Sequence, residues 1–305
     1  MLARHYSRTT NGAKGTRMAG MADIRSLTEE VRRYCEGKDV DLFGVAPVSS
    51  FEDAEERMHP AYYIRGAQSV IVLGLQVPKP IVEQVERRTT PYPYMRFAKA
   101  LINDELDTIA NQVSRFLARQ GYECLPTPAN DWRDPRTLKP MVSHVLSAVA
   151  AGLGEVGWHN MLLTPEFGPR QKLVTIITNA PLEPGHVYDG PPICDRCMRC
   201  VEECNIGAIA SERTRSVTIE GKIFEWGALK RLKCVWECEG FTSKGTFSGG
   251  VGPYGRDMSY PDTTPTPEEI VELQDMKPRW AIGCAARCYA VCNPTAELAA
   301  VRREA

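Results

Sequence analysis

The stretch from Ile193 to Ala210, ICDRCMRCVEECNIGAIA, decides how the second half of this chain folds. Its cysteines follow the spacing C-x2-C-x2-C-x3-C, and they are Cys194, Cys197, Cys200 and Cys204. Three thiolates at this spacing can close around one iron–sulfur cube, whereas the fourth points away and binds a second cube. The stretch therefore predicts a second group of cysteines elsewhere in the chain.

That second group stands near the C-terminus, in the sequence GCAARCYAVCNP. It contains Cys284, Cys288 and Cys292, and the segment between the two groups carries Cys234 and Cys238. If the last cysteine of each run crosses over to the other cluster, the first [4Fe–4S] cluster is held by Cys194, Cys197, Cys200 and Cys292. The second cluster is then held by Cys204, Cys284, Cys288 and either Cys234 or Cys238.

Disulfides, a zinc site and ordinary buried thiols are the alternatives for these cysteines. Disulfides form in oxidising compartments, and nothing in the sequence signals secretion. Zinc sites usually show two separate C-x2-C knuckles. Asn205 and Asn293 stand where proline is usual, and an extra residue separates Cys284 from Cys288. We keep the cluster assignment because that proline shapes a turn and is not a ligand.

Length and composition allow one large domain or two ordinary ones. The chain has 305 residues, of which 43% are hydrophobic, and a formal net charge of −1. This charge favours neither nucleic acid nor an anionic membrane as a partner. No apolar run approaches the length of a membrane span. We expect a cytoplasmic protein whose basic residues 1–20 form a disordered tail.

The first half of the chain predicts a sheet covered by helices. A capping box of Ser26 and Glu29 predicts a helix start, and Gly37 its end. The apolar run at 69–77 lacks alternation, which indicates a strand buried on both faces. Further strands are expected at 40–48, 122–128 and 172–179, and further helices at 94–120 and before the glycines near 152.

The glycine-rich segment AAGLGEVGWHNMLLTPEFGPR carries a second signal. Gly152, Gly154 and Gly157 have the spacing G-x-G-x-x-G of dinucleotide-binding turns. Here a helix precedes the glycines and a strand follows them, which is the wrong order for that fold. Glycine permits positive φ and close backbone approach, so the segment favours contact with a flat ligand of another kind.

Together, these motifs resemble the reductive dehalogenases and epoxyqueuosine reductase. The resemblance covers roughly residues 40 to 295 and implies an α+β fold, in which a ferredoxin-like double-cluster domain follows a nitroreductase-like α/β core. The expected boundaries are 21–190 for the corrinoid-binding core and 191–305 for the cluster domain. The resemblance also implies cobalamin as a cofactor and favours Cys234 over Cys238 as a cluster ligand.

In this family the glycine turn and the residues after it line the cobalamin site. The positions that match are Gly152, Leu153, Gly154, Gly157, Asn160, Leu162 and Arg170. His159, beside the turn, is expected to contact the corrin or a phosphate, or to ligate cobalt from below.

The resemblance also implies a proton donor above the cobalt. The candidates are His144 and Lys139 ahead of the glycine turn, and Tyr254 and Arg256 in the long loop at 240–267. A histidine can donate a proton near neutral pH. The alternative for His144 is a hydrogen-bonded helix histidine.

The resulting expectation is a cobalamin-dependent iron–sulfur reductase, similar to reductive dehalogenases, that acts on a small organic molecule. The expected partner is a ferredoxin- or flavodoxin-type electron donor, with no nucleic acid partner and no membrane span. One alternative is an electron-transfer or corrinoid-handling protein without its own substrate. Another is a flavin-dependent reductase on the nitroreductase-like core.

Overall fold

A four-stranded antiparallel sheet forms the centre of the computed structural model, which describes residues 21–130, 139–231, 233–234 and 286–292. The strand order is β1-β2-β6-β3. The bounds are Leu42–Pro47 for β1, Ser69–Gln76 for β2, Cys124–Thr127 for β3 and Gln171–Thr178 for β6. Each strand expected in this half of the chain is confirmed.

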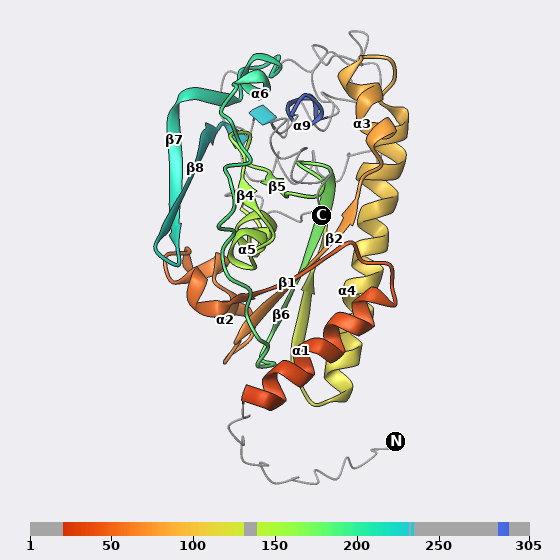
Figure 1. Ribbon diagram of the computed structural model, residues 1–305, viewed down its shortest axis with the longest axis vertical. Helices are drawn as coiled ribbons and strands as arrows, with labels where there is room; N and C mark the ends of the chain where they lie inside the picture. Colours follow the sequence, from red (N-terminus) through yellow and green to blue (C-terminus); the bar gives the residue numbers. More distant parts are fainter. Residues whose placement is uncertain (1–20, 131–138, 232, 235–285, 293–305) are drawn as a thin grey trace, which may run out of the picture.

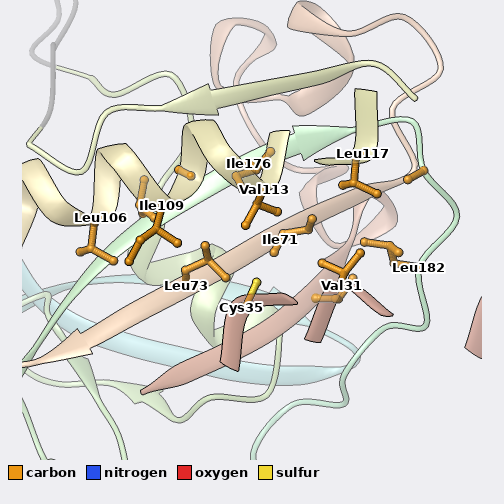
Figure 2. Close-up of a cluster of buried hydrophobic side chains, with 14 of the residues drawn as sticks. Val31, Cys35, Ile71, Leu73, Leu106, Ile109, Val113, Leu117, Ile176 and Leu182 are labelled. Carbon is orange, nitrogen blue, oxygen red and sulfur yellow. The ribbon is translucent and has the colours of Figure 1, made fainter. Parts of the chain in front are cut away.

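Helices α1 (Met21–Glu36) and α4 (Ile102–Arg119) cover one face of the sheet. Figure 2 shows Ile71 and Leu73 of β2 lying between side chains of these two helices, among them Val31 and Val113. The helix expected at 94–120 begins with a π-helical segment, η3 (Tyr94–Leu101). The predicted start at Ser26 is wrong, because α1 already runs from Met21 and Ser26 lies inside it.

Helix α5 (His144–Ala150) and a hairpin of β7 (Ile209–Ile219) and β8 (Lys222–Leu229) lie on the other face. Val70 and Val72 of β2 pack here, while Ile71 and Leu73 face α1 and α4. Because alternate residues of β2 pack on opposite faces and nearly all are buried, the prediction of a strand covered on both faces is confirmed.

The hairpin connects the cluster-bearing half of the chain to the core. Its turn is made by Glu220 and Gly221, both with positive φ, a geometry that matches the twist of a two-stranded hairpin. Ile219, Phe224 and Trp226 bury their side chains in the same cluster as α5. The segments on either side of residue 190 therefore share one apolar layer.

Short elements complete the described fold. Beside the sheet they are η1 (Val48–Phe51), η2 (Glu56–Met58), α2 (Pro60–Tyr63) and α3 (Lys79–Glu86). Near the cysteines they are β4 (Glu155–Val156), β5 (Leu162–Leu163), α6 (Arg199–Glu202) and α9 (Arg287–Ala290). Helices α3, α6 and α9 lie together at one end of the molecule (Figure 1). Among the described residues, no helix is both long and apolar enough to span a membrane.

Candidate iron–sulfur site

Both cysteine runs contribute to one cavity. Four cysteines line it, together with Trp158 and His159 of the glycine-rich segment. These cysteines are Cys194, Cys197, Cys200 and Cys292. The chain thus returns after some 90 residues to bring Cys292 beside the first run, in the grouping that the crossover rule predicts.

Electrostatics also place these four thiols close together. Burial raises the pKa of the Cys200 thiol to about 12, and the neighbouring Cys194 and Cys197 add to the shift. Burial likewise raises the pKa of Cys292, with further contributions from the thiols of Cys194, Cys200 and Cys197. Such a group of thiols cannot ionise together without a compensating cation, and the iron of a cluster supplies one. The donor set therefore fits a [4Fe–4S] cluster.

No disulfide joins the described cysteines. No group of three or more His, Cys, Asp or Glu side chains within the described ranges is arranged to hold a single metal ion. The four thiols instead surround a cavity.

The second predicted cluster is described only in part. Cys204 and Cys288 pack in the same apolar group, beside Trp158 and Ile209. Cys204 Sγ accepts a hydrogen bond from Ala208 N at 3.2 Å, and Lys230 N donates to Ala208 O at 2.8 Å. Cys234 N bonds Lys230 O at 3.1 Å, so Cys234 lies one helical turn beyond this link. Cys284 and Cys238 lie outside the described residues, and the choice between Cys234 and Cys238 stays a prediction.

The glycine-rich segment holds the first cysteine run in place. Glu155 Oε1 accepts hydrogen bonds from Ile193 N and Cys194 N, both at 2.7 Å. Trp158 N donates to Cys194 Sγ at 3.4 Å, and Trp158 Nε1 donates to Ala210 O at 2.9 Å. The start and the end of the run are thereby tied to residues 155–158, a role that the sequence alone did not suggest.

The glycines of this segment approach the chain's own backbone. Gly152 has φ +81°, and a Cβ there would lie 2.1 Å from His186 O. Gly154 has φ +152°, and a Cβ there would lie 2.0 Å from Leu163 O. Both positions therefore require glycine for folding alone. These contacts account for the two glycines without a ligand, and their expected contact with a flat ring stays a prediction.

The other residues predicted to contact cobalamin are distributed around this turn. Leu153 packs on the core beside α5, and Leu162 is buried in β5. Asn160 adopts a left-handed conformation, φ 63°, and its N–H bonds Gly157 O. Arg170 Nη1 contacts Val77 O at 3.5 Å. Their assignment to a corrin stays a prediction.

The described candidates for the proton donor are engaged within the protein. His144 Nδ1 lies 3.2 Å from Thr175 Oγ1, and its Nε2 lies 3.0 Å from Pro128 O. Lys139 forms an ion pair with Glu55. These contacts fit the hydrogen-bonded helix histidine, and the role of His144 as a proton donor stays a prediction. Tyr254 and Arg256 lie outside the described residues.

A tyrosine–lysine group beside α9 was not foreseen from the sequence. Lys172 Nζ lies 3.2 Å from Tyr94 OH, and the rings of Tyr94 and Tyr289 are 5.7 Å apart. Tyr289 is buried, and its hydroxyl has no hydrogen-bond partner among the described residues. Burial raises the pKa of this hydroxyl, so it stays protonated. Its position directly after Cys288 was the signal available in the sequence.

The fold is shared with a B12-dependent reductive dehalogenase. A solved structure of that enzyme matches 92% of this chain and 39% of its own, with a TM-score of 0.51 and 17% identity. No family model matches the chain.

Curated relatives are reductases of two kinds. The epoxyqueuosine reductase of Listeria monocytogenes is 31% identical over 194 residues, which is 59% of this chain and 45% of the relative. The tetrachloroethene reductive dehalogenase of Sulfurospirillum multivorans is 27% identical over 65% of this chain and 34% of its own length. The chain thus spans less than half the length of these relatives. The predicted resemblance to epoxyqueuosine reductases and reductive dehalogenases is confirmed.

One expectation about partners is contradicted. A solved epoxyqueuosine reductase is bound to an epoxyqueuosine-modified tRNA stem loop; it matches 60% of this chain and 52% of its own, with 20% identity and a TM-score of 0.46. The prediction of no nucleic-acid partner relied in part on net charge. Together with the prediction of a small-molecule substrate, it conflicts with the epoxyqueuosine reductases among the relatives. Net charge misses a nucleic-acid partner because binding depends on where charges lie.

Proposed function

We propose that this chain is a cobalamin-dependent iron–sulfur reductase that carries two [4Fe–4S] clusters. The observation that carries the iron–sulfur part is the cavity that Cys292 shares with Cys194, Cys197 and Cys200. Cysteines from distant parts of the chain meet in this cavity, and their spacing in the sequence is that of a double-cluster protein. The two curated relatives described above are reductases, which supports an oxidoreductase.

The proposed second cluster is held by Cys204, Cys234, Cys284 and Cys288. Its support is that Cys204 and Cys288 pack against the same buried residues, and that Ala208 is linked to the end of β8. The proposed division of the chain follows, with a nitroreductase-like core at 21–190 and a ferredoxin-like domain at 191–305. Both clusters would be redox-active groups whose potentials the surrounding protein sets.

The described residues shape the first site in three ways. Glu155 fixes the backbone of the cysteine run, and Trp158 covers the site with a side chain that is 5% exposed. The backbone N–H of Trp158 points at the sulfur of Cys194, as that of Ala208 points at the sulfur of Cys204 in the proposed second site. Such bonds and the exclusion of water both tune a cluster's reduction potential.

The proposal of cobalamin as a cofactor is supported by the relatives alone. This chain shares its fold with a B12-dependent dehalogenase. Bound cobalamin would supply the reductive chemistry. Its proposed contacts are the residues matched by motif, with His144, Lys139, Tyr254 and Arg256 as proposed proton donors. The closed backbone contacts at Gly152 and Gly154 favour a second candidate, an iron–sulfur electron carrier without its own substrate.

The test is the anaerobic purification of the full chain, followed by analysis of iron, sulfide, cobalt and flavin. The proposal predicts about eight irons per chain and base-off cob(II)alamin absorption after reconstitution. Iron without cobalt uptake supports the electron carrier, and bound flavin without cobalt supports the flavin reductase. A chain without iron contradicts the proposal. Turnover is then assayed with the substrates named for the relatives, an epoxyqueuosine tRNA stem loop and tetrachloroethene.

A further inference from the structure

His159 is a buried imidazole in the wall of the cysteine cavity. It is 5% exposed and lines this cavity beside Cys194, Cys197, Cys200 and Cys292. Gly157 makes room for the ring, because a Cβ at that position would lie 2.8 Å from His159 Cε1. The imidazole is therefore built into the same site as the thiols.

One hydrogen bond determines which ring nitrogen carries the proton. Met161 N donates to His159 Nδ1 at 3.2 Å, so Nδ1 presents a lone pair. In a neutral imidazole with this acceptor, the proton resides on Nε2. Nε2 is therefore a hydrogen-bond donor.

That donor has no acceptor within the described protein. Nε2 is buried and has no hydrogen-bond partner among the described residues. Leaving a buried donor unpaired is unfavourable, and such groups in native structures usually have a ligand, an ion or a water as partner. The acceptor is therefore sought in the cavity that His159 lines.

We propose that His159 Nε2–H donates a hydrogen bond to a sulfur of the cluster held by Cys194, Cys197, Cys200 and Cys292, and thereby raises its reduction potential. This inference rests on the proposed function, because it needs the cluster to be present. Reduction adds negative charge to the cluster, and a donor aimed at sulfur stabilises the reduced form more than the oxidised form.

This assignment replaces the expected contact between His159 and a corrin. Four thiolates complete the ligand set of a cube, so the cluster needs no imidazole ligand. A nitrogen that carries its proton also cannot coordinate cobalt. His159 is thus a positioning and tuning residue for the cluster.

The test is a redox titration of the anaerobically purified full chain, followed by paramagnetic resonance. His159→Leu is expected to shift the potential of this cluster to a more negative value and to leave the other cluster unchanged. His159→Gln keeps an N–H donor and is expected to lie between Leu and wild type. His186→Leu is the matched control, because the His186 side chain is 92% exposed and does not line the cavity.

A second readout does not depend on the variants' ability to fold. In wild type, an exchangeable proton coupled to this cluster should carry the nitrogen signature of a labelled histidine. An unchanged potential in His159→Leu with full iron content would overturn the inference. If that variant loses its cluster, the absence of the coupled histidine proton in wild type would overturn it instead. Wild type without iron would defeat the proposed function itself, and iron analysis reports this separately.

Discussion

Helices α6 and α9 begin alike but are held in different ways. Each follows a residue in the left-handed conformation, Met198 (φ 60°) or Ala286 (φ 56°), and each opens with Arg-Cys. The side chain of Arg199 in α6 is half exposed, and its guanidinium pairs with Glu86 at 3.4 Å. The side chain of Arg287 in α9 is only 4% exposed.

The difference lies in what anchors each run to the core. Glu155 and Trp158 hold the first run through its backbone and a thiol. The second run depends on Arg287, which bonds Glu203, 84 residues earlier, and donates to Val85 O at 3.0 Å. Because Glu203 precedes Cys204 and Arg287 precedes Cys288, this ion pair aligns two proposed ligands of the second cluster. The same local motif is therefore fixed by backbone contacts in one place and by a buried charge in the other.

Glu155→Leu should give the largest effect among the anchoring residues. It leaves the N–H groups of Ile193 and Cys194 without an acceptor, which we expect to cost about 4 kcal/mol of unfolding free energy and to empty the first cluster. Glu155→Gln retains one acceptor oxygen and should cost about 1 kcal/mol. Denaturant unfolding and iron content measure both. Equal behaviour of the two variants would contradict the anchoring role.

Arg287→Met tests the anchor of the second run. Arg287→Met removes the charge-assisted hydrogen bond to Glu203, which keeps its contact with Arg88, and leaves Val85 O without this donor. We expect a cost of about 2 kcal/mol and the loss of the second cluster first. The matched control is Arg199→Met at the equivalent, half-exposed position, which should cost less than about 1 kcal/mol. Denaturant unfolding and paramagnetic resonance compare the two variants. If Arg199→Met costs as much as Arg287→Met, burial does not distinguish the two helices.

The same ion pair predicts a dependence of stability on pH. The hydrogen bond from Arg287 holds the pKa of Glu203 below its usual 4.5. A carboxyl with a depressed folded-state pKa stabilises the fold above its unfolded pKa, and this contribution is lost as pH falls through the folded value. Between neutral pH and about pH 3, Glu203→Gln should lose less thermal stability than wild type. Parallel losses would contradict this assignment.

The smallest expected effect distinguishes Tyr289, which lies in α9, from its neighbour Tyr94. Tyr289→Phe removes a buried hydroxyl that has no described partner, so we expect a gain of about 0.5–1 kcal/mol in the metal-free protein. Tyr94→Phe removes a hydroxyl that contacts Lys172 at 3.2 Å and should cost about 1 kcal/mol. Denaturant unfolding of both variants measures these changes in the free energy of unfolding. A loss of stability in Tyr289→Phe would indicate a partner for its hydroxyl.

The sequence could predict features that depend on local pattern. The strand at 69–77 was recognisable because burial on both faces removes alternation. The grouping of Cys292 with the first run followed from the fixed spacing that a cluster imposes on its ligands. The hairpin at Glu220-Gly221 was overlooked, although its turn residues and flanking alternation were visible in the sequence.

Other features depend on distant segments and could not be predicted locally. The contacts of Gly152 and Gly154 come from His186 and Leu163, so glycine spacing alone could not separate a ligand site from a packing requirement. The unpaired Nε2 of His159 likewise becomes visible only when its surroundings are known. The helix start at Ser26 was wrong because a capping pattern can also occur inside a helix.

The most direct test of the account is whether Cys194 and Cys292 hold the same cluster. Cys194→Ser and Cys292→Ser, purified anaerobically, are compared with wild type by iron content and paramagnetic resonance. We expect each variant to lose about four of about eight irons and both to lose the same resonance signal, because these thiols line one cavity. Loss of different signals in the two variants would contradict the crossover on which the proposed site depends.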